Sequence, residues 1–432
     1  MKSEEGRVKN QIEYKYIMKY IITAPQHIDA DIVLPASKSI SNRALVISAL
    51  AGGNKLPQNL SDCDDTRVIT RALANNPYEI DIMAAGTAMR FMTAYLCTQE
   101  GEHVITGTER MRHRPIGILV DALRYLGADI EYVGEEGYPP LKIKGKTLDG
   151  GRLEMPGNVS SQYISALLMI GPSLKNGIEL HLKGEIVSRP YIDLTLWTMT
   201  EYGADVEWTD VDTIAVRPKP YTEREFYIEN DWSASSYWYE ILALVDDRES
   251  KLRLEGLMDG SKQGDSVARY ISSILGVKTA FATRKENTPT TVTLSRHMRT
   301  LPRLDYDFVN SPDLAQTYVA ACCAMNIPFH FTGLASLKIK ETDRIEALKT
   351  ELGKLGYVVK DANNSELIWD GERCEPTGEA IDTYEDHRMA MAFAPLAIKL
   401  GKIEINNPQV VTKSYPAYWD DLKKAGFEIC SI

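Results

Sequence analysis

Hydrophobic residues recur at helical spacing in five stretches of the chain, and each stretch ends at a glycine followed by a short β-rich run. The stretches read ALRYLGADIEY, TMTEYGADVEW, ISSILGVKTAF, ELGKLGYVVKD and LKKAGFEICSI. A glycine just past a helix is a common C-terminal cap, and a β-branched run favours a strand. Successive glycines are 76, 73, 80 and 70 residues apart (Gly127, Gly203, Gly276, Gly356 and Gly426). The near-constant period predicts a duplicated α/β unit, with a shortened sixth copy near RALANNPYEIDIM.

Cations stand where most of these helices are predicted to begin. Arg114, Arg189, Arg344 and Lys413 lie 13, 14, 12 and 13 residues before their glycines, whereas the repeat of Gly276 carries QGDSV there. The first turn of a helix already bears partial positive charge, so a cation there does not stabilise the helix by itself. Backbone N–H groups and cationic side chains together bind anions. Any one of these cations can be incidental, but four of them predict a cleft that holds more than one anionic group.

A further candidate anion site lies in the stretch LPASKSISNRAL, where Lys38 precedes a predicted helix. A lysine followed by a serine resembles the end of an ATP-binding loop, which has the form G-x-x-x-x-G-K-[ST]. The two glycine positions of that loop are occupied by Ile32 and Ser37. The stretch therefore predicts contact with a phosphate that does not belong to ATP.

Several other loops place polar residues at predicted helix starts. The stretches AAGTAMRFM, GNVSSQ, NSPDL, KETDR and YEDHRMAM carry Gly86, Ser160, Asp313, Arg344 and Arg388. Each has an ordinary structural interpretation, since serine and aspartate cap helices and charge runs are often solvated. The lone histidine of DHRMAM has no partner at a metal-ligand spacing, so we expect no metal site.

Composition narrows the possible partners. The chain has 432 residues, of which 44% are hydrophobic and 25% charged, with a formal net charge of −11. Such a field repels nucleic acid and anionic membranes, and we find no apolar run long enough to span a bilayer. The polar N-terminus lacks the apolar core of a secretory signal. Six scattered cysteines without a C-x-x-C pair predict reduced thiols in the cytoplasm.

Taken together, these motifs resemble the 5-enolpyruvylshikimate-3-phosphate synthase family from about Ile21 to the C-terminus. The resemblance rests on ordered blocks: LPASKSISNRAL, AGTAMR, RMRHRPIG, VSSQ with SRPYID, KETDR with DHRMAM, and KSYPAYW. It implies transfer of the enolpyruvyl group of phosphoenolpyruvate to the 5-hydroxyl of shikimate 3-phosphate, with release of phosphate. This step belongs to the shikimate pathway to chorismate and the aromatic amino acids. The family implies no metal or organic cofactor and a monomer.

The resemblance also implies roles for individual residues. Asp313 is expected as the base at the hydroxyl, Glu341 as the acid at C3, and Lys38 as a group that shuttles protons or stabilises charge. Positions matching the shikimate 3-phosphate contacts are Lys38, Ser39, Arg43, Ser160, Ser161, Gln162, Ser188, Tyr191, Asp313, Ser336 and Lys340. Positions matching the phosphoenolpyruvate contacts are Lys38, Gly86, Arg114, Gln162, Arg344, Arg388 and Lys413. Gly86 is also the small residue of members sensitive to the inhibitor glyphosate, and Arg189, which matches neither set, is expected to be incidental.

The fold implied by the resemblance is α/β, with two similar domains that meet at a hinged cleft. Each domain is built from three βαβαββ units arranged as an inside-out α/β barrel. We expect one domain at residues 36–230 and another at 18–35 plus 231–432, with the chain crossing near Leu34–Ser37 and Tyr227–Asp231. Residues 1–17 precede the family's usual start and are expected to be a disordered extension, the product of an upstream start, or a cloning remnant.

Three departures from the family pattern qualify these expectations. Ala84 replaces a common asparagine, Phe91 a common proline, and Ser336 an asparagine that contacts shikimate 3-phosphate. One alternative is the sister enzyme that acts on UDP-N-acetylglucosamine with a loop cysteine, for which Cys97 is the only nearby candidate and is expected inside an apolar helix. Another is a phosphometabolite binder without catalysis, although such a protein would gain little from Asp313 and Glu341.

Overall fold

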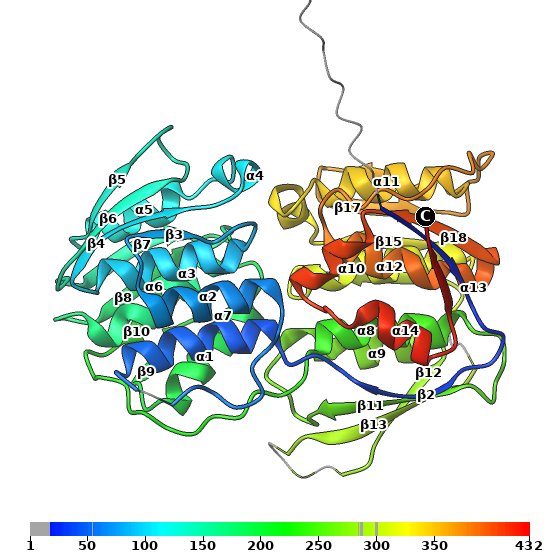
Figure 1. Ribbon diagram of the computed structural model, residues 1–432, viewed down its shortest axis with the longest axis horizontal. Helices are drawn as coiled ribbons and strands as arrows, with labels where there is room; N and C mark the ends of the chain where they lie inside the picture. The colour runs from blue at the N-terminus through cyan, green and yellow to red at the C-terminus, as the bar shows by residue number, and fades with distance from the viewer. Residues whose placement is uncertain (1–17, 54, 284, 286–287, 299–300) are drawn as a thin grey trace, which may run out of the picture.

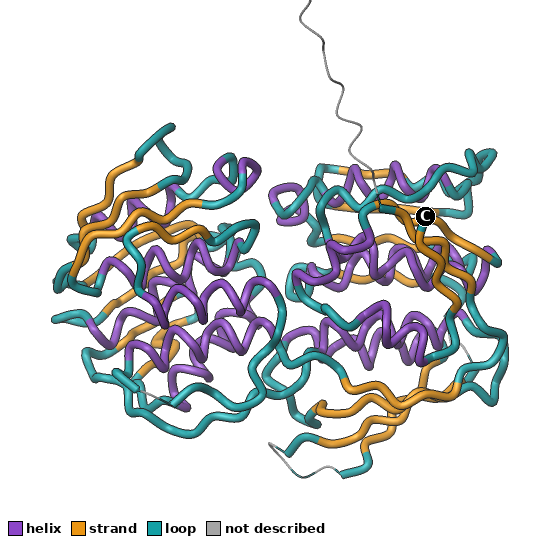
Figure 2. Tube along the Cα trace, in the orientation of Figure 1, coloured by secondary structure: helices purple, strands orange, loops and turns teal. Residues whose placement is uncertain are grey.

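The computed structural model describes residues 18–53, 55–283, 285, 288–298 and 301–432, so the predicted extension 1–17 lies outside the described residues. Two lobes lie side by side (Figure 1). In each lobe the helices run next to one another in the interior, and the strands form sheets at the periphery (Figure 2). One hydrophobic core joins residues between Ala36 and Ile228, and the other joins Ile22–Leu34 to Trp232 and residues beyond it. We call them the inserted lobe (36–230) and the split lobe (18–35 with 231–432).

Two copies of the repeated unit build most of the inserted lobe. In each, two parallel strands joined by a helix are followed by a second helix and an antiparallel hairpin, which gives the sheet orders β3-β4-β6-β5 and β7-β8-β10-β9. The first copy comprises β3 (Glu79–Asp81), α3 (Gly86–Cys97), β4 (Gly101–Thr106), α4 (Glu109–Arg112), α5 (Gly117–Tyr125), β5 (Asp129–Tyr132) and β6 (Leu141–Gly145). The second comprises β7 (Gly151–Pro156), α6 (Ser161–Ile170), β8 (Ile178–Lys183), α7 (Arg189–Glu201), β9 (Val206–Asp210) and β10 (Thr213–Val216).

The third copy of this lobe is reduced. It keeps α1 (Lys38–Leu50) and α2 (Asp64–Asn75), while its strands are represented by isolated bridges from Ala36 to Asn230 and from Gln58 to Tyr227. This is the copy whose terminal glycine the sequence lacks. Asn76 takes the place of the glycine and caps α2 in the left-handed conformation, with φ 39° and ψ 53°.

The split lobe contains two further copies with the same strand order. The first copy pairs β2 with β11 in parallel, although the whole inserted lobe separates them in sequence. Its elements are β2 (Asp29–Val33), α8 (Trp232–Leu244), β11 (Lys251–Leu257), α9 (Ala268–Ile274), β12 (Val277–Phe281) and β13 (Thr290–Arg296). The next copy comprises β14 (Leu304–Asp307), α10 (Ala315–Ala324), β15 (Phe329–Thr332), α11 (Arg344–Lys354), β16 (Lys360–Ala362) and β17 (Glu366–Trp369).

The last copy of the unit is completed by the N-terminal strand. Strand β1 (Lys19–Thr23) lies antiparallel between β18 (Lys402–Asn406) and β19 (Glu428–Ser431). Its helices are α12 (His387–Phe393), α13 (Ala397–Leu400) and α14 (Tyr418–Lys424). The five cap glycines of the repeats all have positive φ, between 83° and 101°, which confirms the predicted helix ends.

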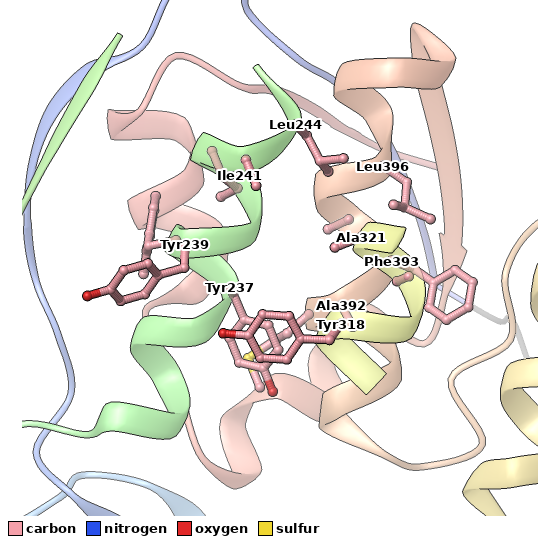
Figure 3. Packing of buried hydrophobic residues seen from close by; sticks show 14 of the residues in the cluster. Tyr237, Tyr239, Ile241, Leu244, Tyr318, Ala321, Ala392, Phe393 and Leu396 are labelled. Atoms are coloured by element: carbon pink, nitrogen blue, oxygen red, sulfur yellow. The ribbon is translucent and has the colours of Figure 1, made fainter. Parts of the chain in front are cut away.

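The core of the split lobe supports one wall of the site described below. Helix α8 packs against α10, α12 and the turn after α12 (Figure 3). Tyr237 and Ile241 of α8 belong to the same core as Tyr318 and Ala321 of α10 and Phe393 of α12. These side chains are almost completely buried, so they fix the helices that present polar residues at their N-terminal ends.

Candidate functional site

A cavity of about 530 Å³ lies between the two lobes. Residues of both lobes line it, because loops and helix starts from each repeat reach the same space. Every predicted site residue except Lys413 belongs to its lining. Lys413 lies in a smaller adjoining pocket with Ala84, Arg114 and Glu341. The structure therefore brings together residues that are up to 375 positions apart in sequence, from Lys38 to Lys413.

Helix α1 presents Lys38 and Arg43 on the wall formed by the inserted lobe. The Arg43 guanidinium donates to Thr195 Oγ1 at 2.7 Å, to Ser165 Oγ at 3.2 Å and to the carbonyl oxygen of Tyr191 at 3.1 Å. All these acceptors are neutral, so burial lowers the pKa of Arg43 to about 10. Lys38 differs, since its Nζ lies 3.7 Å from the carboxylate of Asp65.

The other cations of this wall are also held by neutral groups. Arg90 donates to the carbonyl oxygens of Gly86 at 3.2 Å and Pro115 at 3.1 Å, and burial lowers its pKa to about 10. The buried Nε of Arg114 has no hydrogen-bond partner among the described residues. Ser160 caps α6 by accepting from the backbone N–H of Gln162 at 3.4 Å. This half of the cavity is therefore cationic and rich in hydroxyl groups.

The wall formed by the split lobe carries carboxylates in contact with its cations. Arg344, the first residue of α11, donates from Nε to Asp386 at 2.7 Å, from Nη1 to Asp313 at 3.0 Å and from Nη2 to Glu341 at 2.9 Å. Arg388 donates to the other oxygen of Asp313 at 3.0 Å. Asp386 also caps α12 by accepting from the Arg388 N–H at 2.9 Å, so one buried carboxylate orients both arginines.

Two carboxylates of this wall, Asp313 and Glu341, are held ionised. Burial by itself would raise the pKa of Asp313, but Arg388, Lys340 and Arg344 hold it well below the usual range. Burial likewise opposes ionisation of Glu341, yet Lys413 at 3.2 Å and Arg344 keep its pKa well below the usual range. Two ionised carboxylates therefore lie on either side of the Arg344 guanidinium, and each has further cations around it.

A family model described as EPSP synthase (3-phosphoshikimate 1-carboxyvinyltransferase) matches residues 22–75 and 72–422. The chain belongs to the EPSP synthase family. A 3-phosphoshikimate 1-carboxyvinyltransferase of Bacteroides fragilis is 59% identical over 413 residues, covering 95% of this chain and 99% of that protein. One from Photobacterium damsela subsp. piscicida is 36% identical over 425 residues, covering 92% and 97%. In fold, the chain is similar to an EPSP synthase structure from Acinetobacter baumannii, with a TM-score of 0.74, 19% identity and coverage of 96% and 100%.

Membership of the EPSP synthase family confirms the predicted fold of two similar α/β halves.

The prediction that each repeat cation stands at a helix start is only partly correct. Arg344 and Arg189 are the first residues of α11 and α7. Arg114 precedes α5 by three residues, and Lys413 closes a 3₁₀ helix (Pro408–Lys413) five residues before α14. The cations therefore keep a similar distance from the cap glycine, while the residue at which the helix begins varies by up to five positions.

Arg189 does not reach the cavity. Its guanidinium lies 3.9 Å from the ring centroid of Trp208 and donates to the carbonyl oxygen of Val211 at 3.1 Å. Both partners belong to the region of β9 and the turn after it, so Arg189 stabilises that hairpin on α7. It is the incidental cation of the repeat pattern, as expected.

Several polar residues that line the cavity or lie behind its wall were not among the predicted site residues, and three of them contact or adjoin its cations. Asp65 on α2 lies beside Lys38. Asp386 orients the two arginines. His387 also lines the cavity, and neither of its buried ring nitrogens has a hydrogen-bond partner among the described residues. Burial, together with Lys38 and Arg388, holds the pKa of His387 well below its ordinary value. The sequence does place Asp386 and His387 beside Arg388, and this adjacency was the available signal.

The described residues contain no group of three or more His, Cys, Asp or Glu side chains arranged to hold a metal ion. Within the same part of the chain, no helix combines the length and apolar character needed to cross a bilayer.

Proposed function

We propose that the protein transfers the enolpyruvyl group of phosphoenolpyruvate to the 5-hydroxyl of shikimate 3-phosphate and releases phosphate. The observation that carries the proposal is the placement of Asp313 and Glu341 on either side of Arg344, at 3.0 and 2.9 Å, in a cavity lined with cations. Relatives at 59% and 36% identity carry the name of this enzyme.

The chemistry of the two walls supports a site for each substrate. The phosphate of shikimate 3-phosphate fits the hydroxyl-rich wall, where Ser160 and Ser161 begin α6 and Lys38 begins α1. Ser39, Arg43, Gln162, Ser188, Tyr191, Ser336 and Lys340 line the space left for the ring. Phosphoenolpyruvate, which carries a carboxylate and a phosphate, would bind among Gly86, Arg114, Arg344, Arg388 and Lys413.

The proposed proton transfers follow from the charges at the two carboxylates. Asp313 is ionised and accepts the proton of the 5-hydroxyl. At the same time the oxygen of that hydroxyl attacks C2 of phosphoenolpyruvate. Glu341 must deliver a proton to C3, and it can bind one only when Arg344 and Lys413 turn to the anionic substrate. Binding of phosphoenolpyruvate would therefore raise the pKa of Glu341, so that Glu341 can hold the proton it donates. In the second step Glu341 recovers a proton from the C3 methyl, the double bond re-forms and phosphate leaves.

We also propose that the lobes are the domains of the family and close on shikimate 3-phosphate. The chain passes between the two cores at Pro35 and again between Ile228 and Trp232, and these short crossings would serve as hinges. Closure would bring Arg114 of one wall toward Arg344 of the other, with the bound anions between them. Small-angle scattering with and without shikimate 3-phosphate checks this, since closure decreases the radius of gyration.

A single chain supplies both walls of the cavity, which supports an active monomer. Cys63, Cys97, Cys323, Cys374 and Cys430 are free thiols, which supports a reducing, cytoplasmic location. Cys97, the only candidate for the sister enzyme's loop cysteine, is fully buried at the end of α3, and burial raises the pKa of its thiol.

The decisive experiment measures phosphate release from phosphoenolpyruvate in the presence of shikimate 3-phosphate, UDP-N-acetylglucosamine or no acceptor. We expect release only with shikimate 3-phosphate, with an equimolar enolpyruvyl product identified by mass spectrometry. Release with the UDP-sugar would identify the sister activity. Binding of shikimate 3-phosphate without release would leave a non-catalytic binder and would contradict the proposal.

A further inference from the structure

One repeat carries no cation at the position where the other four do. Thirteen residues before Gly276 stands Gln263, within the segment Ser261–Asp265, which we call the hinge loop. Gln263 is buried, and its side chain contacts both chain crossings between the lobes. Its Oε1 accepts from Ser37 Oγ at 3.0 Å and from the Trp232 N–H at 3.1 Å, and its Nε2 donates to the carbonyl oxygen of Asn230 at 2.9 Å. In this repeat the loop joins the lobes, whereas three of its four counterparts place a cation in the cavity or in the adjoining pocket.

Two residues farther along, Asp265 connects the hinge loop to the substrate cavity. Its buried carboxylate accepts a hydrogen bond from the Tyr191 hydroxyl at 2.9 Å and another from Ser233 Oγ. Tyr191 belongs to α7 of the inserted lobe and Asp265 to the split lobe, so the first bond crosses between the lobes. Tyr191 and Ser233 line the cavity, whereas Asp265 lies behind them.

The surrounding backbone is shaped for this contact. A Cβ atom at Gly264 would lie 2.6 Å from Cβ of Pro190, so only glycine allows α7 to come this close to the hinge loop. The Tyr191 phenol keeps its proton, because burial and the charge of Asp265 raise its pKa well above the ordinary value. The hydroxyl is therefore a donor, and an ionised acceptor gives the stronger bond.

We propose that Asp265 is a positioning residue for the shikimate 3-phosphate site. By accepting the hydrogen bond of the Tyr191 hydroxyl, it fixes the Tyr191 ring, and with it this wall of the site, relative to the hinge loop. The inference rests on the proposed function, since it concerns how that substrate is bound. Asp265 does not line the cavity, so its effect passes through the side chains that donate to it, Tyr191 on the other lobe and Ser233 on its own lobe. The cycle with Tyr191→Phe isolates the path through Tyr191.

The test is a double-mutant cycle on Asp265→Asn and Tyr191→Phe, with the dissociation constant for shikimate 3-phosphate measured by calorimetry in the absence of phosphoenolpyruvate. Both substitutions preserve shape, and each removes the charge-assisted bond. We expect each to weaken binding by about tenfold, the lower end for a hydrogen bond to a charged group. The double variant should bind no more weakly than Tyr191→Phe, because both changes remove one interaction.

Two matched substitutions control for a general loss of stability. Tyr239→Phe removes a buried bond of 2.9 Å to Thr279, and Asp421→Asn removes a buried carboxylate that accepts from Tyr415 at 2.8 Å. Neither residue lines the cavity. We expect both to lower the midpoint of thermal unfolding and to leave the affinity for shikimate 3-phosphate unchanged.

The outcomes separate the inference from the function on which it rests. If the wild-type protein turns over shikimate 3-phosphate but Asp265→Asn binds it normally, or if the two effects multiply in the double variant, the inference is wrong. Should Asp265→Asn fail to fold, normal binding by Tyr191→Phe would overturn the inference equally. A wild-type protein that neither binds nor turns over shikimate 3-phosphate would overturn the proposed function, and the inference with it.

Discussion

The two walls of the cavity hold their cations in opposite ways. On the inserted lobe, Arg43 and Arg90 donate to hydroxyl and carbonyl oxygens. On the split lobe, Arg344 and Arg388 donate to carboxylates. Burial is similar on both sides, yet it lowers the pKa of Arg43 and Arg90 to about 10, whereas the carboxylates outweigh burial and raise the pKa of Arg344 and Arg388. The wall of the inserted lobe therefore has more cations than carboxylates. On the wall of the split lobe, carboxylates of the same lobe balance most of the positive charge.

This difference implies different requirements for the two anions. On the inserted lobe Lys38 has the Asp65 carboxylate beside it, but Arg43 and Arg90 are held by neutral groups, so a bound phosphate adds negative charge to a wall with a surplus of cations. An anion on the split lobe must compete with Asp313 and Glu341 for Arg344 and Lys413. We therefore expect the substrate of the inserted lobe, shikimate 3-phosphate, to bind first. The competition on the other wall is then the step that changes the protonation of Glu341.

The largest expected effect comes from neutralising the carboxylates of the split lobe. Asp313→Asn and Glu341→Gln should each lower kcat by about 10²–10⁴-fold, the range for loss of a general acid or base. Initial rates at saturating substrates measure this. Glu346→Gln is the control, because Glu346 lies on α11, close to Glu341 in sequence, but pairs at the surface with Lys349 at 2.8 Å. A normal kcat in either cavity variant would remove that residue from its role.

Removing the carboxylate that orients both arginines should cost stability. Asp386→Asn removes the carboxylate that lies 2.7 Å from Nε of the buried Arg344. Breaking a buried pair costs about 3–5 kcal/mol, and we expect the lower end because Asp313 and Glu341 still contact Arg344. Urea unfolding measures this change in the free energy of unfolding. The control, Asp361→Asn, breaks a more exposed pair with Lys349, for which about 0–1 kcal/mol is expected. Equal losses in the two variants would contradict the picture of a wall whose cations are balanced by carboxylates of the same lobe.

Buried carboxylates without cationic partners should show the opposite pH dependence. Glu229 lies at the second crossing, where burial raises its pKa to about 7 despite hydrogen bonds from Ser261 and Gln263. A raised folded-state pKa gives stability that is complete below the unfolded pKa, near 4.5, and is lost as pH rises through 7. From pH 5 to pH 8 this loss is about 3 kcal/mol.

Glu229→Gln removes this titration, so its unfolding free energy should fall less between pH 5 and pH 8 than that of the wild type, as measured by urea unfolding. Asp265, with a pKa of about 6, contributes in the same direction and remains in the variant. Asp313 and Glu341, whose pKa values are lowered, stabilise the protein above the unfolded pKa and lose this contribution at acidic pH. An unchanged slope in Glu229→Gln would place the titration elsewhere.

The smallest expected effect tests Arg114, a cation of the inserted lobe that lines both the cavity and the adjoining pocket. In Gly86→Ala the added Cβ would lie 2.6 Å from Nη1 of Arg114, so the guanidinium must shift. We expect KM for phosphoenolpyruvate to rise several-fold, about 1 kcal/mol of lost binding. Glyphosate, as the longer ligand, should lose more. Gly353→Ala is the control, because nothing lies within 4 Å of its added Cβ; equal losses for glyphosate and phosphoenolpyruvate would contradict the steric argument.

The sequence predicts the repeats well because their signals are local. Helix, cap glycine and strand follow one another within a dozen residues, and the five glycines adopt the left-handed conformation that this order requires. The reduced copy has no glycine to find, although Asn76 performs the same capping. Site residues that lie within distinctive motifs, such as Lys38 and Arg344, are found for the same reason.

Roles that depend on distant partners leave no local signal. Asp386 looks like an ordinary helix cap, which it is, but its bond to Arg344 comes from a helix that begins 42 residues earlier. Gln263 interrupts the cation pattern, and only its contacts with both crossings, together with the bond from Tyr191 to the nearby Asp265, explain why. Arg189 matches the pattern and yet packs on Trp208, because the direction of a side chain depends on the hairpin beside it.

The position of β1 has a consequence for biosynthesis. Lys19 and Ile432 exchange backbone hydrogen bonds of 3.0 and 2.9 Å, so the first strand of the chain pairs with its last residues. A ribosome delivers β1 before the whole inserted lobe and delivers β18 and β19 at the end. The inserted lobe can thus fold on the ribosome, whereas β1 keeps unpaired edges until β18 and β19 have been synthesised.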